Sequence, residues 1–125
     1  MPDQRLTFKE MCATFEVTPR TLRYYEYIEL LAPEKEGRKR FYTSREVARM
    51  KLILRGRKYG FSLEEIRQWL MLYEQDGTKV QAQAFVALAD RQLDALKQQQ
   101  RELADAIAEL SDLRDQTVAR AQSAD

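Results

Sequence analysis

The chain has 125 residues, 44% of them hydrophobic and 33% charged, with a formal net charge of +1, one cysteine and no histidine. This length supports one small domain with an extension and is too short for two independent hydrophobic cores. Without histidine the commonest general base and metal ligand are missing, so the composition predicts neither an enzyme nor a metal or cofactor site.

The net charge hides an asymmetry along the chain. Residues 1–75 hold 15 Lys and Arg against 11 Asp and Glu, whereas residues 76–125 hold 6 against 9. A basic half followed by an acidic half suits DNA contact at one end and protein contact at the other. Nothing resembles a signal peptide or a membrane span, so we expect a cytoplasmic protein with no membrane partner.

A first short helix is predicted after Thr7. Thr7 and Glu10 have the spacing of a capping box, and apolar residues follow at helical intervals. Cys12 lies on that apolar face, where a small buried hydrophobe is the favoured interpretation over a nucleophile or sensor. The helix should end near Glu16–Val17, which leaves the turn of about three residues that a helix-turn-helix requires.

The second helix carries the most informative pattern of the chain. Thr18 is a suitable N-cap and Pro19 is preset for the first helical position. Four polar residues then form one stripe: Arg20, Arg23, Tyr24 and Tyr27. Guanidiniums can bind guanine edges or phosphates, and phenol groups can bind phosphates. The alternative is a solvated amphipathic helix whose arginines simply extend into water.

A β-hairpin is predicted between residues 30 and 42. Two short extended runs flank a polar tip that contains Gly37, and the cations of this segment are Lys35, Arg38, Lys39 and Arg40. A charged tip often serves solubility alone. Because this one directly follows a candidate recognition helix, it also suits a basic wing lying over phosphates.

Three further helices follow. Thr43 to Glu46 has the pattern of a capping box for a helix that Gly60 ends, and Ser62 to Glu65 begins the next. Asp76–Gly77 should interrupt the chain before a last helix that starts at Thr78. We expect a winged helix-turn-helix DNA-binding domain over 5–75, a dimerising coiled-coil helix over 78–119 and a flexible tail over 120–125.

The last helix has an apolar seam of heptad type. Residues at alternating spacings of three and four are Val86, Ala89, Leu93, Leu96, Gln100, Leu103, Ile107 and Leu110. A helix of ~40 residues would reach ~60 Å, too long to be covered by so small a domain. A second copy of the chain is the simplest partner, and Gln100 would hold the two copies in one alignment.

The order of these elements closely resembles the MerR family of bacterial transcription regulators. The resemblance covers about residues 6 to 72 and rests on Thr21–Glu26, Arg40-x-Tyr42 and Gly60–Leu63 together. It implies a mostly helical fold and a homodimer with an antiparallel coiled coil. It also implies binding to a pseudo-palindromic element of double-stranded promoter DNA, whose distortion acts on RNA polymerase indirectly.

The resemblance also implies which residues contact DNA. They are Thr18, Arg20, Thr21, Arg23, Tyr24, Arg38, Lys39, Arg40 and Tyr42. One position departs from the family, because Glu29 stands where a glycine is common before the paired leucines. This departure bears on the turn into the wing.

The signal is less clearly marked. Metal-sensing members of the family use cysteines near the start or after the end of the long helix, and no cysteine lies there. Residues 52–63 resemble a subgroup associated with branched-chain amino-acid and fatty-acid catabolism, which implies an organic metabolite or acyl thioester. The possible effector residues are Trp69, Tyr73 and Phe85, although plain packing of aromatics is the favoured interpretation.

Two alternatives stay open at this stage. One is an effector-independent repressor, because activators and repressors of this kind use the same DNA contacts. The other is a coiled-coil interaction protein with weak DNA binding, which the intact Arg-Tyr-Tyr-Glu sequence at 23–26 and the basic wing disfavour.

Overall fold

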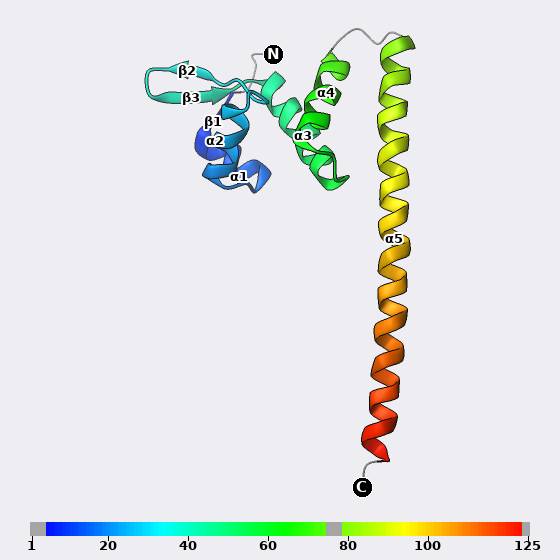
Figure 1. Ribbon diagram of the computed structural model, residues 1–125. Coiled ribbons are helices and arrows are strands. Elements are labelled where there is room, and N and C mark those ends of the chain that lie inside the picture. Colours follow the sequence, from blue (N-terminus) through cyan, green and yellow to red (C-terminus); the bar gives the residue numbers. More distant parts are fainter. Residues whose placement is uncertain (1–4, 75–78, 124–125) are drawn as a thin grey trace. The chain divides into compact units, whose positions relative to one another are not determined.

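The computed structural model describes residues 5–74 and 79–123, without the side chain of Tyr73. Its elements are β1 Leu6–Thr7, α1 Phe8–Phe15, α2 Pro19–Tyr27, β2 Glu34–Glu36, β3 Lys39–Tyr42, α3 Ser44–Lys58, α4 Leu63–Glu74 and α5 Lys79–Gln122 (Figure 1). The predicted fold class is confirmed: a helical domain with a small wing sheet precedes one long helix. The contacts within the chain divide it into two compact units, residues 1–85 and residues 86–125.

The helix-turn-helix is set by side-chain caps at both helix starts. The Thr7 amide donates to the Glu10 carboxylate at 2.9 Å, and the Glu10 amide donates to Thr7 Oγ1 at 3.2 Å. The Thr21 amide donates to Thr18 Oγ1 at 3.0 Å, with Pro19 in the first turn of α2. These bonds satisfy amide groups that a helix start leaves without partners, so both starts agree with the prediction.

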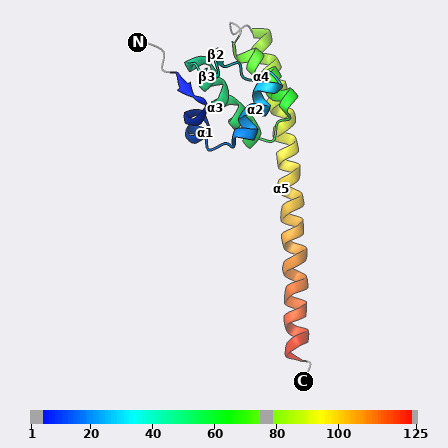
Figure 2. The ribbon, with the colours of Figure 1, turned by 90° about the vertical axis from the view of Figure 1, so that its left-hand side faces the viewer.

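The wing is part of a three-stranded antiparallel sheet of order β1-β3-β2. Strands β2 and β3 form the predicted hairpin, whose tip contains Gly37 at φ +63°. Strand β1 pairs Leu6 with Tyr42 and leads directly into α1 (Figure 2). Strand β1 is not predicted from the sequence, because two residues show no periodicity.

The core of the first unit gathers around α2 and α3. Its fully buried side chains are Met11, Leu22, Leu30, Tyr42, Glu46, Met50, Ile53, Ile66 and Leu70. Glu46 corrects a prediction, since Thr43 makes no side-chain cap bond and Glu46 does not return to it. Instead the Glu46 carboxylate accepts from the Ala32 amide at 2.9 Å and from Arg45 at 2.7 Å. A buried carboxylate of this kind fixes the loop that joins α2 to the wing.

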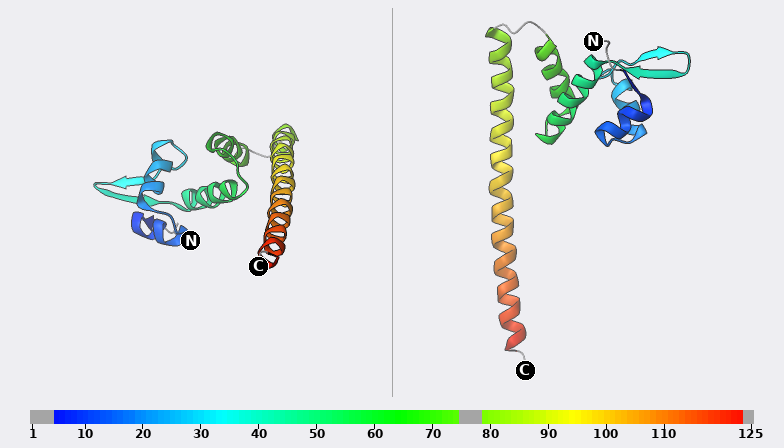
Figure 3. Two further views of the ribbon diagram at one scale, coloured as in Figure 1. Left: turned by 60° about the horizontal axis from the view of Figure 1, so that its bottom comes forward. Right: turned by 180° about the vertical axis from the view of Figure 1, so that it is seen from behind.

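Helices α3 and α4 pack closely at Gly56. A Cβ atom built there would lie 2.7 Å from Ile66 Cγ1, so only glycine fits without a shift. Helix α3 ends before Gly60, whose φ is +83°, and the Ser62–Glu65 capping box begins α4 with bonds of 2.8 and 3.1 Å. Both boundaries agree with the prediction, and Figure 3 shows the two helices neighbouring one another.

Helix α5 is continuous to Gln122, three residues beyond the expected end at 119. All eight predicted seam residues lie exposed or half-exposed on one chain: Val86, Ala89, Leu93, Leu96, Gln100, Leu103, Ile107 and Leu110. Leu103, for example, is 63% exposed. The predicted interruption at Asp76–Gly77 and the helix start at Thr78 lie outside the described residues. The domain boundaries stay predictions.

Candidate nucleic-acid interface

The outer face of α2 is polar, aromatic and open to solvent. Arg20, Arg23 and Tyr24 are exposed, and Tyr27 reaches 83% exposure. A hollow of about 530 Å³ lies along this face, bordered by Arg20, Thr21, Arg23, Tyr24, Tyr25, Tyr27, Arg57 and Leu63. Exposed phenol rings beside guanidiniums favour a nucleic-acid-binding surface over a merely solvated one, because both groups bind phosphates and bases. Arg57, which comes from α3, is not among the residues predicted from the sequence.

Thr18 and Thr21 act chiefly on the helix itself. Thr18 Oγ1 accepts from the Thr21 amide and donates to Thr21 Oγ1 at 2.9 Å. Thr18 is exposed and Thr21 half-buried. The two hydroxyl groups therefore fix the start of α2, from which Arg20 and Arg23 project.

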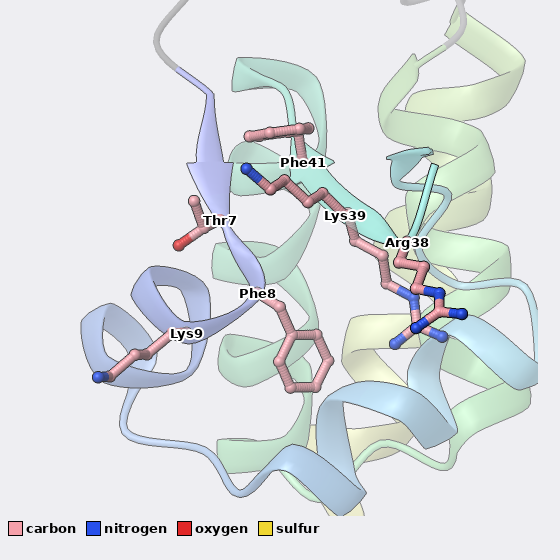
Figure 4. Close-up of a pocket in the computed structure, with 7 residues that line it drawn as sticks. Thr7, Phe8, Lys9, Arg38, Lys39 and Phe41 are labelled. Carbon is pink, nitrogen blue, oxygen red and sulfur yellow. The ribbon is translucent and has the colours of Figure 1, made fainter. Parts of the chain in front are cut away.

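A second basic hollow lies between the wing and the start of α1. It measures about 460 Å³ and is bordered by Thr7, Phe8, Lys9, Arg38, Lys39, Arg40 and Phe41 (Figure 4). Its ionisable lining residues are all cationic, so it has the charge that a phosphate requires. Lys9 and Phe8 were missed because α1 was assigned to the core from its apolar periodicity.

The aromatic ring of Phe8 lies beneath two arginines from different elements. The guanidinium carbon of Arg23 lies 5.2 Å from the ring centre, and that of Arg40 lies 5.6 Å from it. Contacts within about 6 Å are attractive because the face of an aromatic ring is negative. Phe8 thus brings an arginine of α2 and an arginine of the wing to one place.

Tyr42 and Arg40 differ from the other predicted contacts. Tyr42 is fully buried and its hydroxyl donates to the Glu26 carboxylate, so it belongs to the core and not to the exposed surface where a DNA contact was predicted. Burial first, then the hydrogen bond and charge of Glu26, raise the pKa of Tyr42 far above its ordinary value. Arg40 is half-buried, with its Nε 3.5 Å from Glu26 Oε1. The pairing of Arg-x-Tyr with α2 is not visible in sequence spacing.

The segment from α2 to the wing is held by arginines of the helical core. Arg49 Nε donates to the Leu30 carbonyl at 2.9 Å, and Arg67 donates to the Ile28 carbonyl. Glu29, which lies between Ile28 and Leu30, has φ +64°, a left-handed conformation that glycine adopts more readily. The turn thus has the geometry that favours glycine, although glutamate occupies it.

Comparison with known proteins places this arrangement in a family. The family model described as "MerR HTH family regulatory protein" matches residues 6–72, and the model described as "MerR, DNA binding" matches residues 47–113. The chain belongs to the MerR family. This is a family of regulatory proteins and not of enzymes, in agreement with the sequence prediction.

Individual MerR relatives resemble the chain over different lengths. The HTH-type transcriptional regulator ZntR of Escherichia coli K12 is 43% identical over 65 residues, which are 50% of this chain and 46% of that protein. A MerR-family regulator of Bacillus cereus aligns with a TM-score of 0.74 and 27% identity, covering 87% of this chain and 79% of that one. The chain spans about half the length of the curated relatives it matches first.

One solved MerR relative contains a metal. PbrR691 of Ralstonia metallidurans CH34, in complex with lead(II), aligns with a TM-score of 0.68 and 28% identity over 87% of this chain and 85% of that one. Over residues 5–74 and 79–123 of the present chain, no three His, Cys, Asp or Glu side chains form a group suited to a metal. Cys12 is half-buried in α1, and burial raises the pKa of its thiol.

The predicted effector residues of this MerR chain are described in part. Trp69 is 7% exposed, and its ring stacks on Phe85 with centres 5.8 Å apart. The Tyr73 side chain lies outside the described residues. A hollow of about 340 Å³ beside the stack is bordered by Leu52, Arg55, Trp69, Leu72, Gln81, Ala82 and Phe85. In the described part of the chain, no helix has the length and apolar character needed to cross a bilayer.

Proposed function

We propose that this chain is a transcription regulator that binds a two-fold element of double-stranded promoter DNA as a homodimer. The observation that carries the proposal is the exposed stripe of Arg20, Arg23 and Tyr24 on α2, beside the cationic hollow of the wing. Helix α2 would enter the major groove, where guanidiniums bind guanine edges. Arg38 and Lys39 would lie over phosphates of the flanking backbone.

Dimerisation is part of the proposal because α5 leaves a long apolar seam on one chain. Leu103 and Leu110 are 63% and 67% exposed on one chain. Exposure of a regular row of heptad leucines to water is unfavourable, and pairing with a second helix would bury them. Two copies that pair along α5 would present two recognition helices to a two-fold site. Distortion of the DNA between them would act on RNA polymerase indirectly, by changing the alignment of the elements that it contacts.

DNA binding is tested by footprinting on the promoter upstream of the protein's own gene, over a series of salt concentrations. We expect two-fold protection, a steep fall in affinity with salt, and a loss of about tenfold or more for Arg23→Ala. Arg114→Ala removes the same charge from α5, at an exposed residue that pairs with its neighbour Asp115, and should bind as the wild type does. No protection even at low salt would favour a coiled-coil interaction protein.

The signal that we propose is a small organic anion in the hollow beside Trp69. An aromatic stack offers an apolar surface, and the Arg55 guanidinium, 6.0 Å from the Trp69 ring, offers a positive charge at its edge. A short carboxylate has an apolar chain and a negative charge that complement this site, and so does an acyl thioester whose carrier is anionic, such as acyl-CoA. A thiophilic metal is less suited, because these 125 residues contain one Cys and no His.

Trp69 is the single tryptophan of the chain, so its fluorescence reports on this hollow directly. Titration with short-chain carboxylates and acyl thioesters should change the emission, and Arg55→Gln should weaken the response. Arg57→Gln, which removes a charge that borders a different hollow, is the matched control. A response to lead(II) or zinc(II) alone would overturn the organic signal, and no response to either class would favour an effector-independent repressor.

A further inference from the structure

The two oxygens of Glu26 bind two different residues of the wing. Glu26 lies on α2 one turn after Arg23, and its side chain is 13% exposed. Its Oε2 accepts from the buried hydroxyl of Tyr42, and its Oε1 lies 3.5 Å from Nε of Arg40. One carboxylate therefore links the recognition helix to the strand that carries the wing.

The strand geometry makes this link specific. Side chains alternate along a strand, so Arg40 and Tyr42 lie on one face of β3 while Lys39 and Phe41 lie on the other. The opposite face is held separately, because the Arg5 guanidinium lies 4.4 Å above the ring of Phe41. Glu26 is therefore the residue of α2 that holds the inner face of the wing strand in place.

The same link engages the charge of Arg40. A guanidinium that is paired with Glu26 and lies over Phe8 is held in one position, and part of its charge is already neutralised. Arg38 and Lys39, at the tip, are exposed and remain available for phosphates. The wing thus divides into a fixed base and a cationic tip.

We propose that Glu26 is a positioning residue for DNA recognition, which holds the wing tip at the distance from α2 where both reach one duplex together. The proposal rests on the proposed DNA-binding function. It predicts that removal of the negative charge of Glu26 weakens DNA binding. A carboxylate near DNA repels phosphates, so a residue with a purely electrostatic effect would bind DNA better once neutralised.

The test compares Glu26→Gln with Glu16→Gln on a duplex that the wild type enriches from a random pool. Both variants lose one negative charge near α2, and Glu16 is an exposed residue of the turn before it. Glu16→Gln should bind equally or slightly more tightly. Glu26→Gln should bind about tenfold more weakly, with a salt slope lower by about two units, because Arg38 and Lys39 no longer reach phosphates.

A double-mutant cycle separates positioning from general stability. In a background of Arg38→Ala with Lys39→Ala, the wing tip has no cations to position, so Glu26→Gln should cause little further loss. Tyr42→Phe leaves every charge in place and removes one bond to Glu26, so it should reproduce the lower affinity and slope even if Glu26→Gln folds poorly. Tight binding by Glu26→Gln, or an equal loss in the tip-less background, would overturn the proposal. A wild type that enriches no duplex would instead overturn the DNA-binding function.

Discussion

Glu29 shows how a single backbone angle can oppose the residue that occupies it. Its φ of +64° lies in the left-handed region, where a Cβ atom is crowded by the following carbonyl. The turn nevertheless forms, because the Leu30 and Leu31 amides both donate to the Tyr25 carbonyl, at 2.9 and 3.3 Å. The bonds after the turn stabilise a conformation that Glu29 itself disfavours.

Replacement of Glu29 by glycine should therefore stabilise the fold. Relief of the left-handed strain exceeds the extra entropy of glycine in the unfolded chain, so the free energy of unfolding should rise by about 0.5–1 kcal/mol. Urea unfolding followed by circular dichroism measures the change. Glu29→Ala, which removes the carboxylate but keeps the Cβ atom, is the control. A glycine variant no more stable than the alanine variant would show that the strain of the backbone angle does not exceed the entropy cost of glycine.

At the scale of elements, the packing of α3 against α4 depends on the missing side chain of Gly56. In an exposed helix, alanine is more favourable than glycine by about 1 kcal/mol. Here the added Cβ atom would meet Ile66 Cγ1 at 2.7 Å, so Gly56→Ala should instead destabilise the domain by about 1–3 kcal/mol. Thermal unfolding gives the sign directly.

The collision with Ile66 has its own test. Ile66→Ala should destabilise the domain by leaving a cavity, and the new Cβ atom of Gly56→Ala should partly fill that cavity. The double variant should then lose less stability than the sum of the two single losses. Additive losses would mean that Gly56 tolerates a methyl group and that helix packing is looser than the structure has it.

An ion-pair network joins the first turns of α3 to the last residue of α4. Arg45 and Arg49 both bind Glu74, with Arg45 at 3.2 Å. Burial acts to raise the pKa of Glu74, but the hydrogen bonds and charges of Arg49 and Arg45 outweigh it and leave the pKa below its ordinary value of 4.5. The carboxylate form thus stabilises the fold. This contribution is complete above the ordinary pKa and is lost as pH falls through the lowered value.

Glu74→Gln should accordingly be less stable than the wild type near neutral pH. The difference between the two should shrink in acid, when the wild-type carboxylate is protonated. Urea unfolding at several values between about pH 7 and about pH 3 measures this convergence. Glu109→Gln, an exposed carboxylate of α5, is the matched control. A gap that stays constant across this range would mean that the Glu74 charge does not stabilise the fold.

The elements of this fold were predictable where one local signal sufficed. Thr7, Thr18 and Ser62 cap the helices that their spacing indicated, because a cap depends on residues within one turn. Glu46 was misassigned, since its partner Ala32 lies 14 residues away and no spacing rule connects them. The prediction that Tyr42 contacts DNA failed for the same reason, because no spacing rule connects Tyr42 with its partner Glu26. Its bond to Glu26 spans 16 residues, so burial and not residue type decided its role.

At the scale of the whole molecule, the exposed apolar seam of α5 needs a partner. In the proposed function that partner is a second copy of the chain. A charge at the centre of that seam should prevent pairing, because two carboxylates would face each other across an apolar interface. Leu103→Asp should therefore sediment as a monomer at concentrations where the wild type is a dimer. Ala108→Asp adds the same charge to an exposed residue outside the seam and should leave the dimer intact.

The same pair of variants tests whether DNA binding depends on two chains. A monomer can occupy only one half of a two-fold site, so Leu103→Asp should lose most of its affinity for the complete site and retain weak affinity for an isolated half. Its recognition helix is unchanged, since residue 103 lies in the second unit and α2 in the first. If Leu103→Asp were monomeric yet bound the complete site as tightly as Ala108→Asp, α5 would have a role other than joining two DNA-binding domains.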